Sequence, residues 1–497
     1  MIFDTKAGAP PLQSKYDICV IGSGPAGITL ALKLAEGGKR VVLLEAGGRD
    51  FTSESQEIYE SDNLGFEFQS TDISRLRYLG GTSGHWTGRC LLLDPSDFEV
   101  RDDIPLSGWP IGFNDILPYQ AEAAEILGVT NFDRGRTPLD DTGILDIVEQ
   151  RFSSEHKFGN VFGSESRRFG TYYYSALSES KAIDVVLNAN LTEFSLDSAT
   201  GRFAHARYQD YSQNFYEIRA DIFILAMGGI ENSRFMLQLN EAQNDRFGNQ
   251  NDMVGRCFMD HLRLPLGVYF ITKRLYSNSP NWEFARLLRR IIPQIALSPS
   301  PDFARKNKIL NGVIRLDRLH RRPLNEKEIG TSEFMRNLRY DSDYFFVGQS
   351  IASSEHAPNP DSRVVLTEKL DKFGLKKLGM DVQITPKDIE TMRRVALETA
   401  EYFVRSGLGR MQVNSAMWEH GSPEDMELDF SMHAMGGLRM TETPETGVVD
   451  ANCRVHGAQN LYVAGSGVFP TSGMANPTFT IVQLALRLAD HLLVRTS

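Results

Sequence analysis

The sequence predicts an α/β protein in which one sheet-based domain is assembled from separated parts of the chain and a second domain is inserted into it. Near the N-terminus, two apolar strands at Tyr16–Ile21 and 40–45 flank a helix at Pro25–Glu36. Strand, helix and strand in so short a span form a right-handed βαβ unit with parallel strands. Further buried strands are predicted far downstream, at 221–227 and 460–464. Distant segments therefore complete the same sheet.

The rest of the sequence predicts the last helix of this domain and the elements of the inserted one. An amphipathic helix is expected over 477–495, because apolar residues recur there at helical spacing. Strand-like pieces and one helix are expected at 267–272, 344–350, 379–384 and 387–406. We therefore assign residues 1–95, 181–262 and 428–497 to a nucleotide-binding domain, and residues 96–180 and 263–427 to a substrate-binding domain.

Composition narrows the class of protein. The chain has 497 residues, of which 41% are hydrophobic and 24% are charged, as in an ordinary globular enzyme. Its formal net charge of −11 argues against a nucleic-acid partner, since phosphate binding needs basic surface. No apolar run approaches the length of a membrane helix, and no secretory signal is visible, so we expect a cytoplasmic protein without a membrane partner. The cysteines and histidines show no metal-binding spacing, so we expect no metal.

A glycine-rich turn joins the first strand to the first helix. It reads Gly22-Ser23-Gly24-Pro25-Ala26-Gly27, which is the GxGxxG pattern of dinucleotide-binding sites. The glycines permit the tight turn, the approach of a pyrophosphate to the backbone, and close packing of helix on strand. Glu45 follows at the end of the second strand, where a ribose-binding carboxylate is expected. The motif alone does not distinguish FAD from NAD.

An ordered set of further motifs resembles one family, the glucose–methanol–choline (GMC) oxidoreductases. The motifs include LGGTSGHWTGRC, FILAMGGIENSRFML, VGRCFMDH, SMHAMGGLRM and GVFPTSGMANPTFTIVQLALRLAD, and the resemblance covers most of the chain. It implies an FAD-dependent alcohol oxidase or dehydrogenase. It also implies a Rossmann-like FAD-binding domain and an inserted substrate domain that is built on an antiparallel sheet.

The resemblance also implies which residues contact FAD. Leu191 and Ala226 would lie near the adenine, and Ala46 would follow Glu45 in the nucleotide site. The residues expected beside the isoalloxazine, the ribityl chain and the phosphates are Gly80, Gly81, Thr82, Gly465, Ser466, Pro477 and Thr478. Small residues of this kind also occur in ordinary turns.

Two residues are candidates for catalysis. By resemblance, His433 would be the base that removes a hydroxyl proton, and Asn476 would orient the substrate oxygen. A neutral imidazole can accept such a proton, and an amide can donate a hydrogen bond to a developing alkoxide. Asn476 before Pro477 is also typical of a helix N-cap followed by proline at N1, and both roles can hold together. The triplet Gly436-Gly437-Leu438 differs from the Gly-Thr-Cys of many relatives. This difference is expected to alter the local packing more than the chemistry.

His85 and Trp86 resemble a His-Trp segment that pyranose oxidase and fructose dehydrogenase share. In pyranose oxidase, this histidine is joined covalently to FAD. A covalent link through His85 and a non-covalent histidine near the ring are both open. His261, in the FMDH segment, is expected to have a structural or outer-shell role. Glu355 either approaches the substrate or is a solvated loop carboxylate.

The pattern as a whole predicts an enzyme that oxidises a CH–OH group with FAD. The His–Asn pair and His85 favour a sugar or glycoside hydroxyl that becomes a ketone. Reoxidation by O2, by a quinone or by a partner subunit stays open. The alternatives are a hydroxynitrile-lyase-like enzyme that binds FAD without redox turnover, and a dehydrogenase of a non-sugar alcohol or a sterol.

Overall fold

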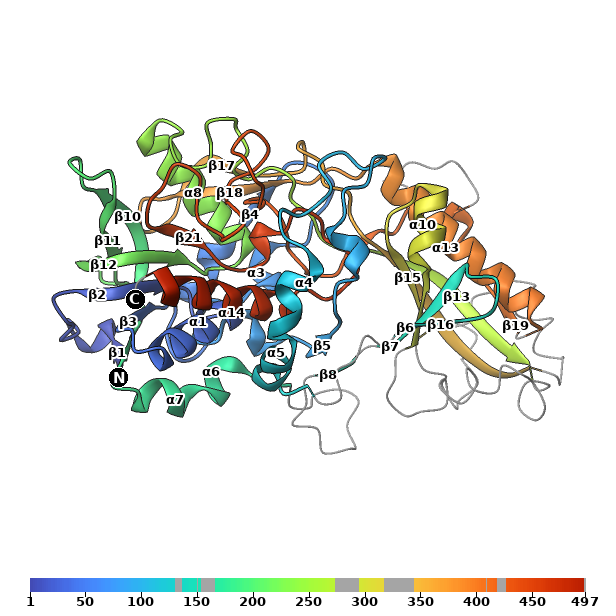
Figure 1. Ribbon diagram of the computed structural model, residues 1–497, viewed down its shortest axis with the longest axis horizontal. Coiled ribbons are helices and arrows are strands. Elements are labelled where there is room, and N and C mark those ends of the chain that lie inside the picture. Colours follow the sequence, from blue (N-terminus) through green and yellow to red (C-terminus); the bar gives the residue numbers. More distant parts are fainter. Residues whose placement is uncertain are drawn as a thin grey trace.

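The fold is taken from a computed structural model, which describes residues 1–129, 136–149, 151–152, 166–272, 295–316, 344–407, 409–417 and 426–495. Two large sheets lie at opposite ends of the elongated molecule (Figure 1). Both chain termini lie at the end that holds the first sheet. No helix among these residues is long and apolar enough to cross a membrane.

The first sheet contains the predicted βαβ unit. Its strand order is β1 (Ile2–Asp4), β9 (Ile183–Leu187), β3 (Val41–Leu44), β2 (Tyr16–Ile21), β12 (Phe215–Leu225), β11 (Phe203–Gln209) and β10 (Asn190–Leu196), with β21 (Leu461–Val463) beside the end of β12. β2 is parallel to both β3 and β12, which confirms the predicted parallel arrangement. Parallel strands that are covered on both faces read as continuous apolar runs, which is why they were visible in the sequence.

Helices cover this sheet and complete its core. α1 (Pro25–Glu36) packs beside α14 (Thr478–Arg495), although they lie at opposite ends of the chain (Figure 1). α8 (Gly229–Gln243) follows β12. Smaller helices are α2 (Ser53–Gln56), α3 (Thr71–Ser74), α4 (Phe113–Ile116), α5 (Gln120–Leu127), α6 (Phe169–Tyr172) and α7 (Tyr174–Glu179).

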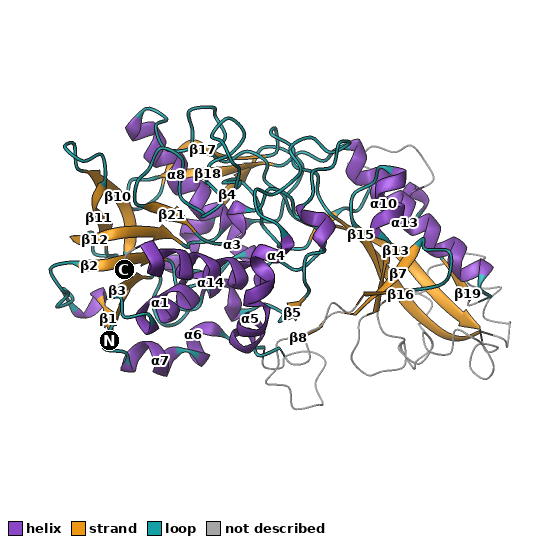
Figure 2. Cartoon of the chain, in the orientation of Figure 1, coloured by secondary structure: helices purple, strands orange, loops and turns teal. Residues whose placement is uncertain are grey.

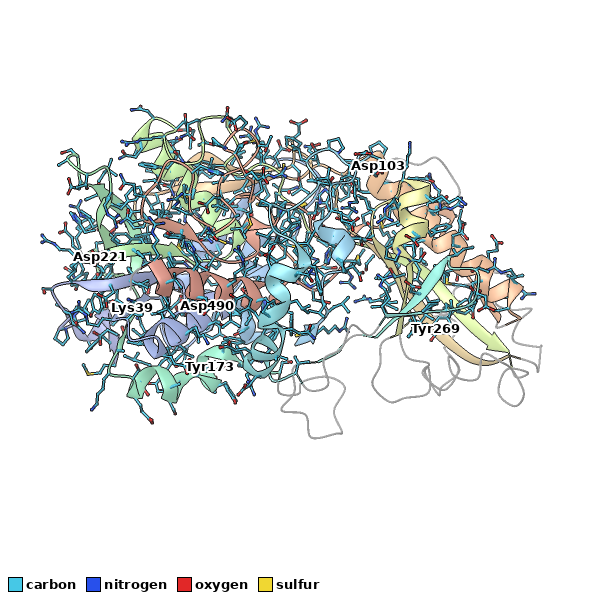
Figure 3. All side chains as sticks on the ribbon, in the orientation of Figure 1. Lys39, Asp103, Tyr173, Asp221, Tyr269 and Asp490 are labelled. Atoms are coloured by element: carbon cyan, nitrogen blue, oxygen red, sulfur yellow. The ribbon has the colours of Figure 1, made fainter. Side chains whose placement is uncertain are left out.

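The second sheet is antiparallel, as expected. Its order is β19 (Gly409–Met411), β13 (Leu262–Thr272), β16 (Tyr344–Ser354), β15 (Gly312–Leu316), β14 (Ile295–Pro299), β7 (Leu145–Glu149) and β6 (Arg136–Pro138), with β20 (Asp429–Phe430) beside the start of β13. α13 (Pro386–Arg405) and α10 (Pro301–Asn307) cover one face of it (Figure 2). At the start of α13, the Lys387 ammonium lies 2.6 Å from the carboxylate of Asp103, which belongs to the distant loop between the 3-10 helix Pro95–Phe98 and α4. Figure 3 labels Asp103 at this end of the molecule.

The structure also contains two small sheets that the sequence analysis did not predict as sheets. β17 (Arg363–Leu370), β18 (Lys376–Asp381) and β4 (Ser61–Asn63) form a three-stranded sheet, and β5 (Arg89–Cys90) pairs with β8 (Arg151–Phe152). The strand expected at 379–384 therefore begins and ends three residues earlier. β12 likewise ends at Leu225, two residues before the predicted end, because Ala226 and Met227 turn away to line a cavity.

Candidate active site

One cavity of about 340 Å³ lies at the carboxyl ends of the parallel strands of the first sheet. The turns after β2, β3, β12 and β21 all contribute to its wall. In α/β sheets this edge is where ligands bind, and the volume lies in the range of small-molecule and cofactor sites. The cavity extends to the loop before α14 and to the residues around His433.

The glycine-rich turn shapes one wall of the cavity. A Cβ on Gly22 would lie 2.5 Å from the Ala226 carbonyl oxygen, and one on Gly27 would lie 1.8 Å from the Gly22 carbonyl oxygen. These two glycines therefore permit close packing of backbone on backbone. A Cβ on Gly24 would meet nothing within 4 Å, and Gly24 is the N-cap of α1. The open space beside a helix N-terminus suits a pyrophosphate, because the helix dipole and free N–H groups favour an anion there.

Glu45 lies at the edge of the same cavity. Its carboxylate accepts hydrogen bonds from the backbone N–H of Ser23 at 3.0 Å, the hydroxyl of Ser23 at 2.6 Å, and the backbone N–H of Gly47 at 2.9 Å. Burial raises the pKa of this carboxyl, and the three donors oppose that effect. The side chain is therefore held in one orientation at the cavity, and its role as a ribose ligand stays a prediction.

A buried group of charged side chains lines the cavity and was not predicted from the sequence. The Arg75 guanidinium lies 3.9 Å from the centre of the Tyr59 ring and 3.7 Å from the Glu231 carboxylate. Arg77 donates to the Tyr211 hydroxyl at 2.8 Å. Arg75 Nη1, Arg77 Nε and Glu231 Oε2 are buried without a hydrogen-bond partner, and such polar atoms suit a polar occupant.

Most of the residues expected to contact FAD do line this cavity: Gly22, Ser23, Gly24, Pro25, Ala26, Glu45, Ala46, Gly81, Thr82, His85, Trp86, Leu191, Ala226, Gly465, Ser466, Asn476, Pro477 and Thr478. Gly27 and Gly80 lie behind the wall. Gly27 packs under Gly22, and the Gly80 N–H donates to the Ser23 hydroxyl at 3.2 Å. His85 follows the short 3-10 helix Gly81–Gly84 and has an exposed side chain.

His433 and Asn476 meet at the inner part of the cavity. Nδ2 of Asn476 lies 3.1 Å from Nε2 of His433. The other ring nitrogen of His433, Nδ1, lies 2.9 Å from Nδ1 of His261, and Nε2 of His261 lies 3.0 Å from the Gly473 carbonyl oxygen. Two histidines that are far apart in sequence are therefore in direct contact. α14 begins at Thr478, one residue later than expected, and the Pro477 carbonyl accepts its first hydrogen bond.

Asp260 holds the backbone around both histidines. Its carboxylate accepts hydrogen bonds from the N–H groups of His261 at 2.6 Å, Ser431 at 3.2 Å and His433 at 2.9 and 3.0 Å. Asp260 is fully buried. This role was not predicted from the sequence, where the only signal is that Asp260 directly precedes a histidine in the FMDH segment.

Burial dominates the electrostatics of these groups. It lowers the pKa of His433 well below 6.5, and the neighbouring His261 adds to that effect. It also lowers the pKa of His261 to about 4. Burial raises the pKa of Asp260 to about 7, although its three N–H donors pull in the opposite direction. Both imidazoles are therefore neutral near pH 7.

Glu355 does not line the cavity and is not a solvated loop carboxylate. It is fully buried, and the Arg101 guanidinium donates to both of its oxygens at 3.0 and 2.7 Å. It also accepts from the Gly473 N–H at 3.2 Å. Glu355 is thus linked to His261 through the backbone of Gly473, and its negative charge opposes the lowering of the His261 pKa.

The chain is similar to known oxidoreductases over almost its whole length. A family model described as GMC oxidoreductase matches residues 358–485, and one described as FAD binding domain matches residues 17–54. The 2-methyl-1,2-propanediol dehydrogenase of Mycolicibacterium austroafricanum is 23% identical over 97% of this chain and 96% of its own length. The fructose dehydrogenase large subunit of Gluconobacter japonicus is also 23% identical, over 96% of this chain and 97% of its own length.

A solved structure agrees with the fold. Pyridoxine 4-oxidase from Mesorbium loti superposes with a TM-score of 0.61 at 16% identity, covering 96% of this chain and 98% of that one. At such low identity, the likeness supports a common fold but does not identify the substrate.

Proposed function

Because this chain belongs to the GMC oxidoreductase family and is an FAD-dependent oxidoreductase, we propose that it oxidises a hydroxyl group of a sugar or glycoside to a ketone. The observation that carries the proposal is the contact between His433 and Asn476 at the cavity wall. Oxidation of an alcohol needs a base for the hydroxyl proton and a hydrogen-bond donor for the developing alkoxide, and these two groups lie 3.1 Å apart here.

The chain's own residues would act as follows. Nε2 of His433 takes the hydroxyl proton, since the Asn476 amide nitrogen can only donate to it and the imidazole is neutral. The Asn476 N–H then donates to the developing alkoxide. As the carbonyl double bond forms, the hydrogen on the same carbon leaves with its electron pair. Bound FAD supplies the acceptor for that hydride.

The residues at the cavity fit FAD. Gly24 leaves room for a pyrophosphate at the N-terminus of α1, and Glu45, held by Ser23, supplies a carboxylate that could bind a ribose hydroxyl. Arg75 Nη1, Arg77 Nε and Glu231 Oε2, which are buried and make no hydrogen bond, offer polar contacts to a large polar cofactor. His85 lines the same cavity, so both a covalent and a non-covalent FAD fit its position.

Two observations support a polyhydroxylated substrate. The relatives reported above are named for fructose and for a vicinal diol. The hydroxyls of Thr87 and Ser431 line the cavity together with His433, and they can hydrogen-bond to neighbouring hydroxyls of a sugar. For reoxidation of the reduced flavin we propose O2, a quinone or a partner subunit. The partner subunit is included because one relative is itself named as a large subunit.

The test is anaerobic mixing of the FAD-loaded protein with sugars, glycosides, vicinal diols, sterols and cyanohydrins. We expect sugars or glycosides to bleach the flavin absorbance and to yield a keto sugar that is detected by mass spectrometry. Bleaching by sterols or simple diols alone would contradict the sugar assignment. An unbleached flavin together with cyanohydrin cleavage would replace oxidation by a lyase reaction.

A further inference from the structure

The protonated nitrogen of His433 can be deduced from a chain of contacts that ends at a backbone carbonyl. The Gly473 carbonyl oxygen can only accept, so Nε2 of His261, at 3.0 Å, carries the hydrogen. Because neutral His261 has one N–H, its Nδ1 accepts. Nδ1 of His433, at 2.9 Å, is therefore the donor, and Nε2 of His433 keeps its lone pair. The Asn476 amide donates to that lone pair, which agrees with the assignment.

The carbonyl at the end of this chain is itself fixed. Gly473 has a φ of +55°, and a Cβ there would lie 2.5 Å from Leu93. Its N–H donates to Glu355, which is held in turn by Nη1 and Nη2 of Arg101. The acceptor that sets the orientation of His261 therefore cannot easily rotate.

The two histidines are brought together by one carboxylate. Asp260 binds the N–H groups of His261 and His433, which are 172 residues apart in sequence, and that of Ser431 as well. Met432, between the last two, has a φ of +60°, so the loop has a left-handed bend at this point. Such a conformation is unfavourable for a residue other than glycine and persists only where its surroundings enforce it. The Asp260 hydrogen bonds on both sides of Met432 supply that constraint.

We propose that Asp260 and His261 are positioning residues: Asp260 fixes the two histidine backbones, and His261 accepts the Nδ1–H of His433, so that the Nε2 lone pair faces the cavity. The proposal rests on the proposed function only in making that lone pair the base. A purely structural role for the two residues would leave the tautomer of His433 unaffected once the protein is folded.

The first test is the tautomer itself, measured by ¹⁵N NMR on imidazole-labelled, FAD-loaded protein, with signals assigned by their loss in His433→Gln. We expect Nδ1 of His433 to carry the hydrogen in the wild type. His261→Leu removes the acceptor, and we expect the hydrogen to move to Nε2. His261→Asn places an amide oxygen near the position of Nδ1, and we expect it to retain the wild-type tautomer.

The second test is the rate constant of flavin reduction by the substrate found above. We expect a loss of about 10²-fold or more for His261→Leu, because the base would hold its hydrogen on the wrong nitrogen, and recovery to within about 10-fold of the wild type for His261→Asn. Asp260→Asn would set an N–H against the His433 N–H, so we expect a loss of about 10-fold. Asp388→Asn is the matched control, since Asp388 is a buried carboxylate that binds the N–H groups of Ala357 and Thr385 outside the cavity.

The two proposals fail separately. An Nε2–H tautomer in the wild type, or an unchanged tautomer and rate in His261→Leu, would overturn the positioning role even if alcohols bleach the flavin. An Nδ1–H tautomer that changes in His261→Leu would support it even if no alcohol bleaches the flavin. Retained FAD and unchanged circular dichroism identify the variants that fold.

Discussion

At the scale of single residues, the proposed chemistry depends on which atoms of His433 and Asn476 face each other. His433 and Asn476 were both predicted from the motifs around them, and the structure brings them into contact at the cavity. Their catalytic roles stay predictions. His261 was expected to have a structural or outer-shell role, but the hydrogen bonds of Asp260 to the His433 backbone were not predicted, because these two residues are 173 positions apart and no local pattern joins them.

Replacing Asn476 by alanine tests its role as the donor to the substrate oxygen. We expect the rate of flavin reduction to fall about 10²–10³-fold, the usual cost of removing one such donor. Asn476→Asp, which has the same shape but offers an acceptor, should lose at least as much. Asn190→Ala is the control, because Asn190 is buried outside the cavity wall and donates to the Gln209 carbonyl. Equal rates in Asn476→Ala and Asn190→Ala would dismiss the donor role.

The pH dependence of the same rate follows from the buried histidine. If His433 is the base, its neutral form is the active one, and its pKa is held well below 6.5 by burial and by His261. The fraction of neutral imidazole is therefore complete at pH 7 and falls only on the acid side. In Asp260→Asn, where Asp260 cannot titrate, we expect stopped-flow rates at saturating substrate to be level above pH 6.5. An inflection near pH 7 would be assigned to Asp260, whose pKa is about 7, and should vanish in Asp260→Asn. A rate that rises between pH 8 and 9 in both proteins would speak against His433.

At the scale of elements, the βαβ unit was the part that sequence reasoning predicted best. β2 and α1 have the predicted bounds, because a fully buried strand and a glycine turn leave strong local signals. The short strands β4 and β5 were not predicted, since their partners lie far along the chain and they carry no periodic pattern. The division into two domains at the stated boundaries stays a prediction.

Two glycines of the same turn should respond differently to alanine. Gly24→Ala places a methyl group in open space beside α1, so we expect weaker FAD retention with unchanged stability of the FAD-free protein. Gly27→Ala places it 1.8 Å from the Gly22 carbonyl oxygen, and we expect destabilisation by about 1–3 kcal/mol or more. Equilibrium denaturation and FAD release measure the two effects. Equal destabilisation by both variants would contradict the assignment of Gly24 to the cofactor.

At the scale of the whole molecule, a buried ion pair between Arg101 and Glu355 joins the loop before α4 to the end of β16 in the second sheet. Glu355 directly follows β16, and Arg101 lies in the loop after the 3-10 helix Pro95–Phe98. The pair is almost entirely shielded, and its Glu355 end supports Gly473. The sequence suggested neither the pairing nor the burial, because both depend on the packing of distant loops.

Breaking this pair should cost more than breaking an exposed one. Arg101→Leu leaves the Glu355 carboxylate buried and unpaired, so we expect a loss of about 3–5 kcal/mol in unfolding free energy. Arg305→Leu removes the exposed pair with Glu99 and should cost about 1 kcal/mol or less. Denaturant titration compares the two, and a similar loss in both would mean that Glu355 is not isolated from solvent.

In the proposed reaction, His433 takes the substrate proton while FAD accepts the hydride. The most direct measurement is the anaerobic stopped-flow rate of flavin reduction in the wild type and in His433→Ala, each with its FAD content determined. We predict a fall of about 10²–10⁴-fold with FAD retained, as expected for the loss of a general base. A His433→Ala protein that reduces its flavin at the wild-type rate would contradict the account.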